Sequence, residues 1–355
     1  MLPRPMRSLE LLGSLVLSTA LLACTSGSPA GGDAGILTTG NGQWTQLNSG
    51  LPDSDVVALA SQGTKLYALT SGASANFYLS SDAAASWTHA TGDLMVPGTS
   101  DTAISAFALS GTAIVAGAGL LFDSANDGQH WTVVNDTAGN PVVYTMVRVF
   151  GSDVFVGTVG GMLVSHDGGA TWATAQVNDS TGNSSPWVDG VPQTMASVGG
   201  HYLVGVGLGK SVWTSSDAGD HWVTSNAGLP PGAGGAGGAS ITAFGVHGSV
   251  VFAGAGASGI YKSTDGGTSW SASSSGFYNA SNPLGPTTAY AFSVNGSSVY
   301  AGTDSGVYVS TNDGASWSTL DRGDLPDFTA VYSMTVMGAN LYIGTYTTGV
   351  WRHAL

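Results

Sequence analysis

The chain has 355 residues, of which 54 are glycine and only 8% are charged. Its formal net charge of −14 argues against nucleic acids and anionic membrane surfaces as partners, because both attract basic surfaces. With 43% hydrophobic residues and ten tryptophans, the chain can bury a large core, which excludes an intrinsically disordered protein. The length fits two average domains or one large all-β domain.

The N-terminal residues have the pattern of a secretory signal. Arg4 and Arg7 precede an apolar stretch, 9–22, that is too short and too weakly flanked to predict a membrane-spanning helix. It ends in Leu-Leu-Ala-Cys at Cys24, a string that resembles the lipobox of bacterial lipoproteins. The resemblance implies cleavage before Cys24 and lipidation of its thiol. The alternative is an ordinary secretory signal followed by a stray cysteine.

These features predict the domain organisation. We expect a signal peptide over 1–23, the lipidated cysteine with a flexible Ser/Gly-rich tether over 24–40, and a folded domain over 41–355. The resemblance to bacterial lipoproteins implies the cell envelope as the location. An aspartate after the cysteine implies retention in the inner membrane in that family, so Thr25 implies the outer membrane in a cell that has one. Cys24 is the only cysteine, so we expect no disulfide, no thiol catalysis and no Cys-ligated metal in the folded domain.

One eight-residue string recurs six times, and we call it the turn motif. It follows the pattern Ser-x-Asp-x-Gly-x-x-Trp with few substitutions. Three short runs of β-branched and aromatic residues, with glycine between them, precede each copy, which predicts three strands before the motif and one after it. The copies end at Trp87, Trp131, Trp172, Trp222, Trp270 and Trp317, which are 44, 41, 50, 48 and 47 residues apart.

The last repeat, 329–355, holds three strand-like runs and stops before a further motif. The run around Trp44 can supply its missing fourth strand. We therefore predict an all-β fold, a single seven-bladed β-propeller with four antiparallel strands per blade, whose seventh blade is closed by the N-terminal strand. Closure of the ring removes the exposed sheet edges that an open array would present.

The turn motif resembles the Asp-box, or BNR, repeat, and its copies cover nearly all of the folded domain. The resemblance implies that the acidic positions are structural and lie on an outer edge away from the ligand. A short Asp or Asn side chain can accept backbone N–H groups in a tight turn. One copy carries Ala84 in place of the usual glycine. The positions expected to have this structural role are Asp82, Asn126, Asp167, Asp217, Asp265 and Asn312.

Ligand-binding residues are expected in the irregular connections between blades, because loops carry most binding residues. Several of these connections place aromatic rings beside carboxylates, a combination that suits glycan or peptide binding. For Trp187 and Phe328 the alternative is that each ring only anchors its own loop. The candidate residues are Asp55, Asp101, Trp187, Asp189, Tyr278, Asp327 and Phe328.

Two functions from different classes fit this pattern. The first is a monomeric, lipid-anchored, non-enzymatic module that binds or scaffolds a protein or glycan, without a cofactor, metal or catalytic residue. It resembles the single-propeller photosynthetic assembly factors, although their basic patch is missing. The alternative is a glycoside hydrolase, similar to the xyloglucanase-like Asp-box enzymes, that uses two of Asp55, Asp101 and Asp189. A sialidase mechanism is excluded, because the only glutamate, Glu10, lies in the signal.

Overall fold

A computed structural model describes most of the folded domain. Cys24 and the expected signal peptide lie outside the described residues, as do Asp101, Asp189 and Tyr278. Within the described part, no helix has both the length and the apolar character needed to cross a membrane. The described residues are 44–52, 55–71, 76–95, 103–111, 113–134, 143–178, 182–187, 190–207, 209, 211–231, 239–277 and 287–355.

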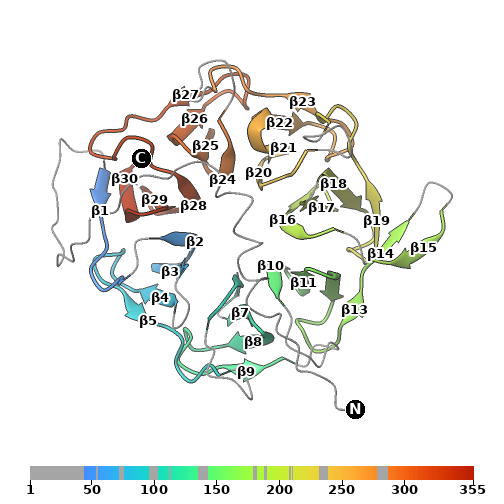
Figure 1. Ribbon diagram of the computed structural model, residues 1–355, viewed down its shortest axis with the longest axis horizontal. Coiled ribbons are helices and arrows are strands. Elements are labelled where there is room, and N and C mark those ends of the chain that lie inside the picture. The colour runs from blue at the N-terminus through green and yellow to red at the C-terminus, as the bar shows by residue number, and fades with distance from the viewer. Residues whose placement is uncertain are drawn as a thin grey trace, which may run out of the picture. The chain divides into compact units, whose positions relative to one another are not determined.

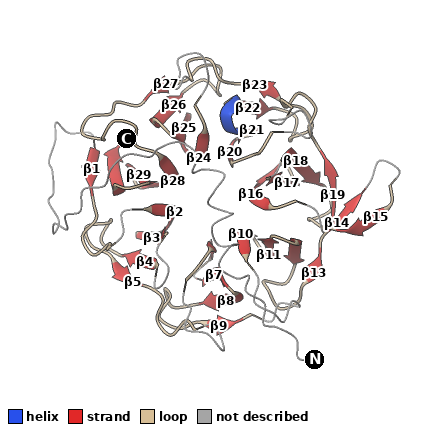
Figure 2. Ribbon diagram, in the orientation of Figure 1, coloured by secondary structure: helices blue, strands red, loops and turns tan. Residues whose placement is uncertain are grey.

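The described residues form seven antiparallel sheets arranged in a ring, so the predicted seven-bladed β-propeller is confirmed (Figure 1). In the described part the only helix is one short 3-10 turn, Gly256–Ser258 (Figure 2). Blade 1 consists of β2 (Val56–Gln62), β3 (Lys65–Thr70), β4 (Phe77–Ser80) and β5 (Thr88–His89), and blade 2 of β6 (Ala106–Ser110), β7 (Ala113–Ala118), β8 (Leu120–Ser124) and β9 (Thr132–Val133). Blade 3 consists of β10 (Tyr144–Phe150), β11 (Asp153–Thr158), β12 (Gly161–Ser165) and β13 (Ala173–Thr174), and blade 4 of β16 (Pro192–Val198), β17 (His201–Val206), β18 (Ser211–Ser215) and β19 (His221–Thr224). Blade 5 consists of β20 (Ala243–His247), β21 (Val250–Gly254), β22 (Ile260–Ser263) and β23 (Ser271–Ala272), and blade 6 of β24 (Ala289–Asn295), β25 (Ser298–Thr303), β26 (Gly306–Ser310) and β27 (Ser318–Thr319). Blade 7 consists of β28 (Val331–Met337), β29 (Asn340–Thr345), β30 (Gly349–Ala354) and β1 (Trp44–Gln46).

The two ends of the propeller meet in the seventh blade, as predicted. Strand β1 pairs antiparallel with β30 (Figure 1), and in the register of this pair Trp44 lies opposite His353. The Trp44 indole Nε1 donates a hydrogen bond to the main-chain oxygen of Asp321 at 2.8 Å. Strand β1 is therefore the fourth strand of the seventh blade, and its pairing with the last strand of the chain completes the ring.

One blade carries an addition that the repeats do not predict. Strands β14 (Gln176–Asn178) and β15 (Ser184–Pro186) form a hairpin, and β14 pairs parallel with the outer strand β19, giving a six-stranded sheet. The residues of β15 are exposed, and each strand has only three residues, of which Val177 is the one large apolar side chain. The sequence therefore lacks the signal from which strands are usually recognised.

Burial falls from the second strand of each blade to the fourth. The second strands are almost wholly buried, whereas the two-residue fourth strands β5, β9, β13, β23 and β27 are exposed. Glycine on the second strand lets the next blade approach closely. A Cβ added at Gly302 would lie 2.7 Å from Val331, and one at Gly344 would lie 2.6 Å from Val56. Part of the high glycine content therefore serves blade-to-blade packing.

The six turn motifs share one hydrogen-bond pattern. In the fifth copy, the Ser263 hydroxyl donates to Asp265 Oδ1 at 2.7 Å and accepts the main-chain N–H of Gly267 at 2.8 Å. Asp265 Oδ1 also accepts the N–H of Ser269 at 2.9 Å. The same three bonds occur in each of the other copies, with Asn126 and Asn312 accepting through their amide oxygens. Each motif thus satisfies its own backbone donors, as turns that lie between strands require.

Candidate functional site

The strand order divides the propeller into two faces. Antiparallel strands reverse direction at every loop, so the loops between strands one and two and between strands three and four lie on the same face. This turn face carries all six turn motifs. The opposite face, which we call the connection face, carries the loops between strands two and three and the connections from blade to blade. Ligand contacts predicted in the connections therefore belong to the face opposite the motifs.

Three tyrosines gather on the connection face, over blades 6 and 7. Strands β24 and β28 each contain a β-bulge just after their first residue, and Tyr290 and Tyr332 are the residues left out of the register. The two rings lie 5.0 Å apart, and Tyr332 lies 5.9 Å from Tyr346 in the next loop. Bulges redirect side chains and are common beside binding sites. We call Tyr290, Tyr332 and Tyr346 the tyrosine rim.

Two carboxylates flank the tyrosine rim. Asp55 Oδ1 accepts the main-chain N–H of Thr347 at 2.8 Å, which ties the start of blade 1 to the loop that carries Tyr346. Asp304, in the loop between β25 and β26, accepts hydrogen bonds from the hydroxyls of Thr287 and Ser305. Both side chains are thereby held in place beside aromatic rings that belong to neighbouring blades.

Burial and negative charges keep Tyr290 and Tyr332 protonated. Burial, followed by the charge of Asp304, raises the pKa of Tyr290 to about 12. Burial first, and then the charges of Tyr346, Asp55 and Asp304, raise the pKa of Tyr332. Near neutral pH the two phenols are therefore hydrogen-bond donors. Tyr346 is 37% exposed, and Tyr290 and Tyr332 are partly exposed, so the rim offers ring surface to solvent.

The connection from blade 6 to blade 7 presents a further exposed aromatic side chain. Phe328 is 62% exposed and has a φ of +60°, a backbone conformation that bulky residues rarely adopt. Arg322 organises this connection, because its Nη1 lies 3.0 Å from Asp327 Oδ1 and its Nη2 donates to the main-chain oxygen of Ser305 at 3.0 Å. Ser305 is the neighbour of Asp304, so the connection is tied to the loop that flanks the tyrosine rim.

The described candidate residues therefore divide into two groups. Asp55, Asp327 and Phe328 lie on the connection face of blades 6, 7 and 1, and their role in binding stays a prediction. Trp187 is only 1% exposed; its ring lies 5.3 Å from that of Trp213 and 5.8 Å from that of Trp222. Such a ring has no surface for a ligand, so Trp187 takes the alternative role of anchoring its loop between blades 3 and 4.

Sequence reasoning missed the tyrosine rim and Asp304. The repeats do contain a pattern that could have identified the rim: the second residue of the first strand is tyrosine in blades 6 and 7. The bulged residues of three other blades are Val57, Thr145 and Gln193. Tyrosine at this position therefore distinguishes blades 6 and 7 from these three blades. Aromatic faces, phenol donors and fixed carboxylate acceptors together suit a polar ligand with flat or apolar faces.

No group of three or more metal-ligating side chains occurs among the described residues. The described chemistry of the rim is therefore that of aromatic rings, hydroxyls and single carboxylates.

Comparison of the sequence finds no matching family model and no matching curated protein. Among solved structures, the chain is similar to YCF48 bound to a D1 peptide, with 14% identity, a TM-score of 0.61, and coverage of 91% of this chain and 98% of the other. It is also similar to the extracellular domain of the putative one-component system BT4673 of B. thetaiotaomicron, with 11% identity, a TM-score of 0.64, and coverage of 88% and 40%. A third similar structure is the GH74 xyloglucanase of Xanthomonas campestris, with 19% identity, a TM-score of 0.60, and coverage of 87% and 53%. The chain thus spans about half or less of the last two proteins, and all three likenesses bear on the fold alone.

Proposed function

We propose that this protein is a non-enzymatic binding module whose ligand, a protein segment or a glycan, contacts the connection face over blades 6, 7 and 1. The observation that carries the proposal is the tyrosine rim, in which two bulged inner strands present tyrosines between Asp55 and Asp304. Loops held in place by a rigid ring are a common setting for binding residues. The YCF48 propeller with its bound D1 peptide gives a precedent for ligand binding by this fold.

The turn motifs have a different role in this proposal. Their acidic side chains accept backbone N–H groups within their own turns, as Asp265 does from Ser269. We propose that the motifs are Asp-box repeats with a purely structural role, and that the ligand does not touch them. We also propose that lipidation of Cys24 anchors the propeller to the cell envelope, with 24–40 as the tether. Two or more acyl chains would make such anchoring stable.

The proposal is tested by a search for ligands followed by a rim variant. The full chain, carrying Cys24→Ser to prevent lipidation, is screened on peptide and glycan arrays, and each hit is then measured by calorimetry. Replacing Tyr346 with serine and Phe328 with alanine should weaken binding by about ten-fold or more, because buried aromatic contacts usually dominate such interfaces. Val133→Ala is the matched control, since Val133 is also exposed but lies on the outer strand β9.

A ligand whose affinity is unchanged by the rim variants but reduced by Val133→Ala would contradict the proposed face. Hydrolysis of a glycan hit would favour the second candidate, a glycoside hydrolase with paired aspartates. This candidate is supported by the placement of Asp55 and Asp304, which are both held by hydrogen bonds on the connection face beside the tyrosine rim. In that case Asp55→Asn or Asp304→Asn should abolish turnover while leaving glycan binding intact.

A further inference from the structure

One position on the second strand of each blade faces the following blade, and in every seam except that between blades 6 and 7 it faces the turn motif of that blade. The position is fixed by register: in six blades it follows the residue that pairs with the motif serine, as Val154 pairs with Ser165. In six of seven blades it holds tyrosine, phenylalanine or leucine, and in blade 2 it holds valine. The residues are Tyr67, Val115, Phe155, Leu203, Phe252, Tyr300 and Tyr342.

The large side chains at this position fill the seam between blades. Phe155 lies edge-to-face on Trp222 with ring centres 6.4 Å apart, and Phe252 lies the same way on Trp317 at 5.8 Å. They also fill the space beneath the motif glycine. A Cβ added at Gly219 would lie 2.3 Å from the Phe155 ring. These seams therefore hold one aromatic ring each between the motif glycine and the motif tryptophan.

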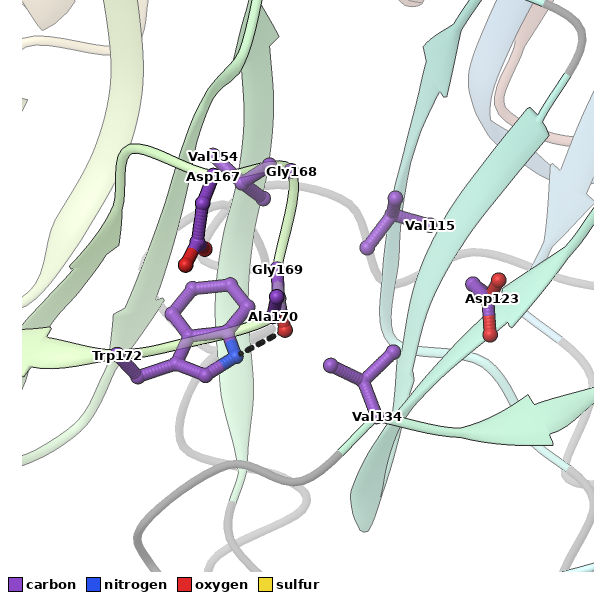
Figure 3. A pocket seen from close by; sticks show the side chains of 9 residues that line it. All are labelled: Val115, Asp123, Val134, Val154, Asp167, Gly168, Gly169, Ala170 and Trp172. Carbon is purple, nitrogen blue, oxygen red and sulfur yellow. Dashed lines mark hydrogen bonds between the residues drawn. The ribbon is translucent and has the colours of Figure 1, made fainter.

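The seam between blades 2 and 3 has no such ring. Val115 is too short to reach the motif, and a Cβ added at Gly169 would meet nothing closer than 3.5 Å. A hollow of about 350 Å³ results, and Figure 3 shows it open between the two blades. Its wall is formed by Val115, Val134, Val154 and the indole of Trp172, with the carboxylates of Asp123 and Asp167 also lining it.

The tryptophan of this seam differs from its counterparts. The other motif tryptophans are between 0% and 6% exposed, whereas Trp172 is partly exposed. Trp131 and Trp317 donate their indole N–H groups to a carbonyl of the preceding blade, at Ala90 and Ser273. Trp172 donates within its own turn, to Gly169 (Figure 3), as Trp222 does to Gly219, but the Trp222 ring is 0% exposed. The indole face is thus available to an occupant that the chain itself does not supply among its described residues.

We propose that this seam hollow binds a small phenol, with its ring edge-to-face on Trp172. The six filled seams define the preferred occupant, because the blades there enclose a ring or a branched side chain of similar size. Apolar hollows large enough for a benzene ring do bind such rings. The neighbouring seam indicates where the hydroxyl goes, since the Tyr67 phenol donates to Asp127 at 2.6 Å. The third motif has Gly168 where the second has Asp127, so the acceptor in the seam hollow is the lining carboxylate of Asp123.

The test uses p-cresol, titrated into the full chain and followed by calorimetry and by proton NMR. We expect one site, contacts between the cresol ring and the Trp172 indole in nuclear Overhauser spectra, and about five-fold weaker binding of toluene, which lacks the hydroxyl. Benzoate should not bind, because its charge opposes the lining carboxylates. The site is separate from the tyrosine rim, so this result does not depend on the proposed function.

Two substitutions should abolish cresol binding by filling the hollow from opposite sides: Val115→Phe and Val134→Phe. Val133→Phe is the matched control, because this neighbouring side chain is 49% exposed and does not line the hollow. Equal loss of binding in the control and in Val134→Phe would overturn the proposal. So would the absence of cresol–Trp172 contacts in the unmodified chain, a readout that does not require any variant to fold.

Discussion

The indole nitrogen of Trp270 donates a hydrogen bond to the main-chain oxygen of Ser225, three residues beyond the tryptophan of the preceding motif, at 3.0 Å. In the same way, Trp317 donates to Ser273, which is three residues beyond Trp270, and Trp87 donates to Leu47, which is three residues beyond Trp44. Trp44 therefore takes the place of a motif tryptophan in the blade that has no motif. These bonds join neighbouring blades, and the pattern includes the split seventh blade.

Trp44 is accordingly expected to contribute as much as a core residue, although it lies at the first described position. Trp44→Ala should lower the free energy of unfolding by about 3–5 kcal/mol, as large-to-small changes in cores do. Trp44→Phe keeps most of the ring and loses the bond to Asp321, so the loss should be only about 1 kcal/mol. Urea denaturation measures both. Equal losses would mean that the hydrogen bond, rather than packing, closes the seventh blade.

Ala84 should be a site of stored strain. It stands where five motifs have glycine, and it adopts a φ of +70°. Ala84→Gly should raise the free energy of unfolding by about 1 kcal/mol, because the left-handed region is costly for a residue with a Cβ. Ala85→Gly is the control: its φ is not positive, and it should lose about 0.5–1 kcal/mol. Destabilisation by both changes would contradict the strain at Ala84.

Acid should weaken the motifs that carry aspartate. Hydrogen bonds from the Ser269 hydroxyl and N–H, and from Ser263, lower the pKa of Asp265 to about 2. Because the pKa is lower in the folded state, the ionised carboxylate stabilises the fold at pH values above its ordinary pKa of 3.8. This contribution to the free energy of unfolding is lost as the pH falls toward 2. In Asp265→Asn the amide oxygen can accept the same N–H, as Asn312 does. The stability difference between this variant and the unmodified chain should shrink between pH 5 and pH 2; a constant difference would contradict the assignment.

His166 should make stability depend on pH near neutrality. Its ring bonds Asp153 at 2.9 Å and Asp220 of the next blade at 3.1 Å, and hydrogen bonds to Asp153 first and Asp220 second raise its pKa. The stabilisation is complete below the ordinary value of 6.5 and is lost as pH rises through the folded-state pKa. His166→Gln should flatten stability above pH 6.5. A slope that is the same in His166→Gln and in the unmodified chain would contradict this assignment.

Trp187→Ala should destabilise the propeller by about 3–5 kcal/mol, because its ring is buried between Trp213 and Trp222. Thermal unfolding measures this loss. A variant that melts like the unmodified chain would contradict the buried position.

The repeats made the ring predictable, because tryptophans at nearly constant spacing require equivalent blades, and the missing strand identified Trp44 as its closing element. The tyrosine rim was not predictable in the same way. Tyr290 and Tyr332 look like ordinary strand aromatics, and only the bulges remove them from the pairing. For Trp187 the sequence left ligand binding and loop anchoring open, and its 1% exposure favours loop anchoring. Its place in the core depends on Gly161, where an added Cβ would lie 1.9 Å from the Trp187 oxygen.

The division between a binding face and a structural face is tested most directly by measuring ligand affinity and melting temperature together for Tyr346→Ser and Asp265→Ala. The account predicts that Tyr346→Ser weakens the ligand by about ten-fold with little change in melting temperature. Asp265→Ala should lower the melting temperature and leave the affinity of the folded protein unchanged. The opposite pattern would contradict it: lost affinity with Asp265→Ala and lost stability alone with Tyr346→Ser.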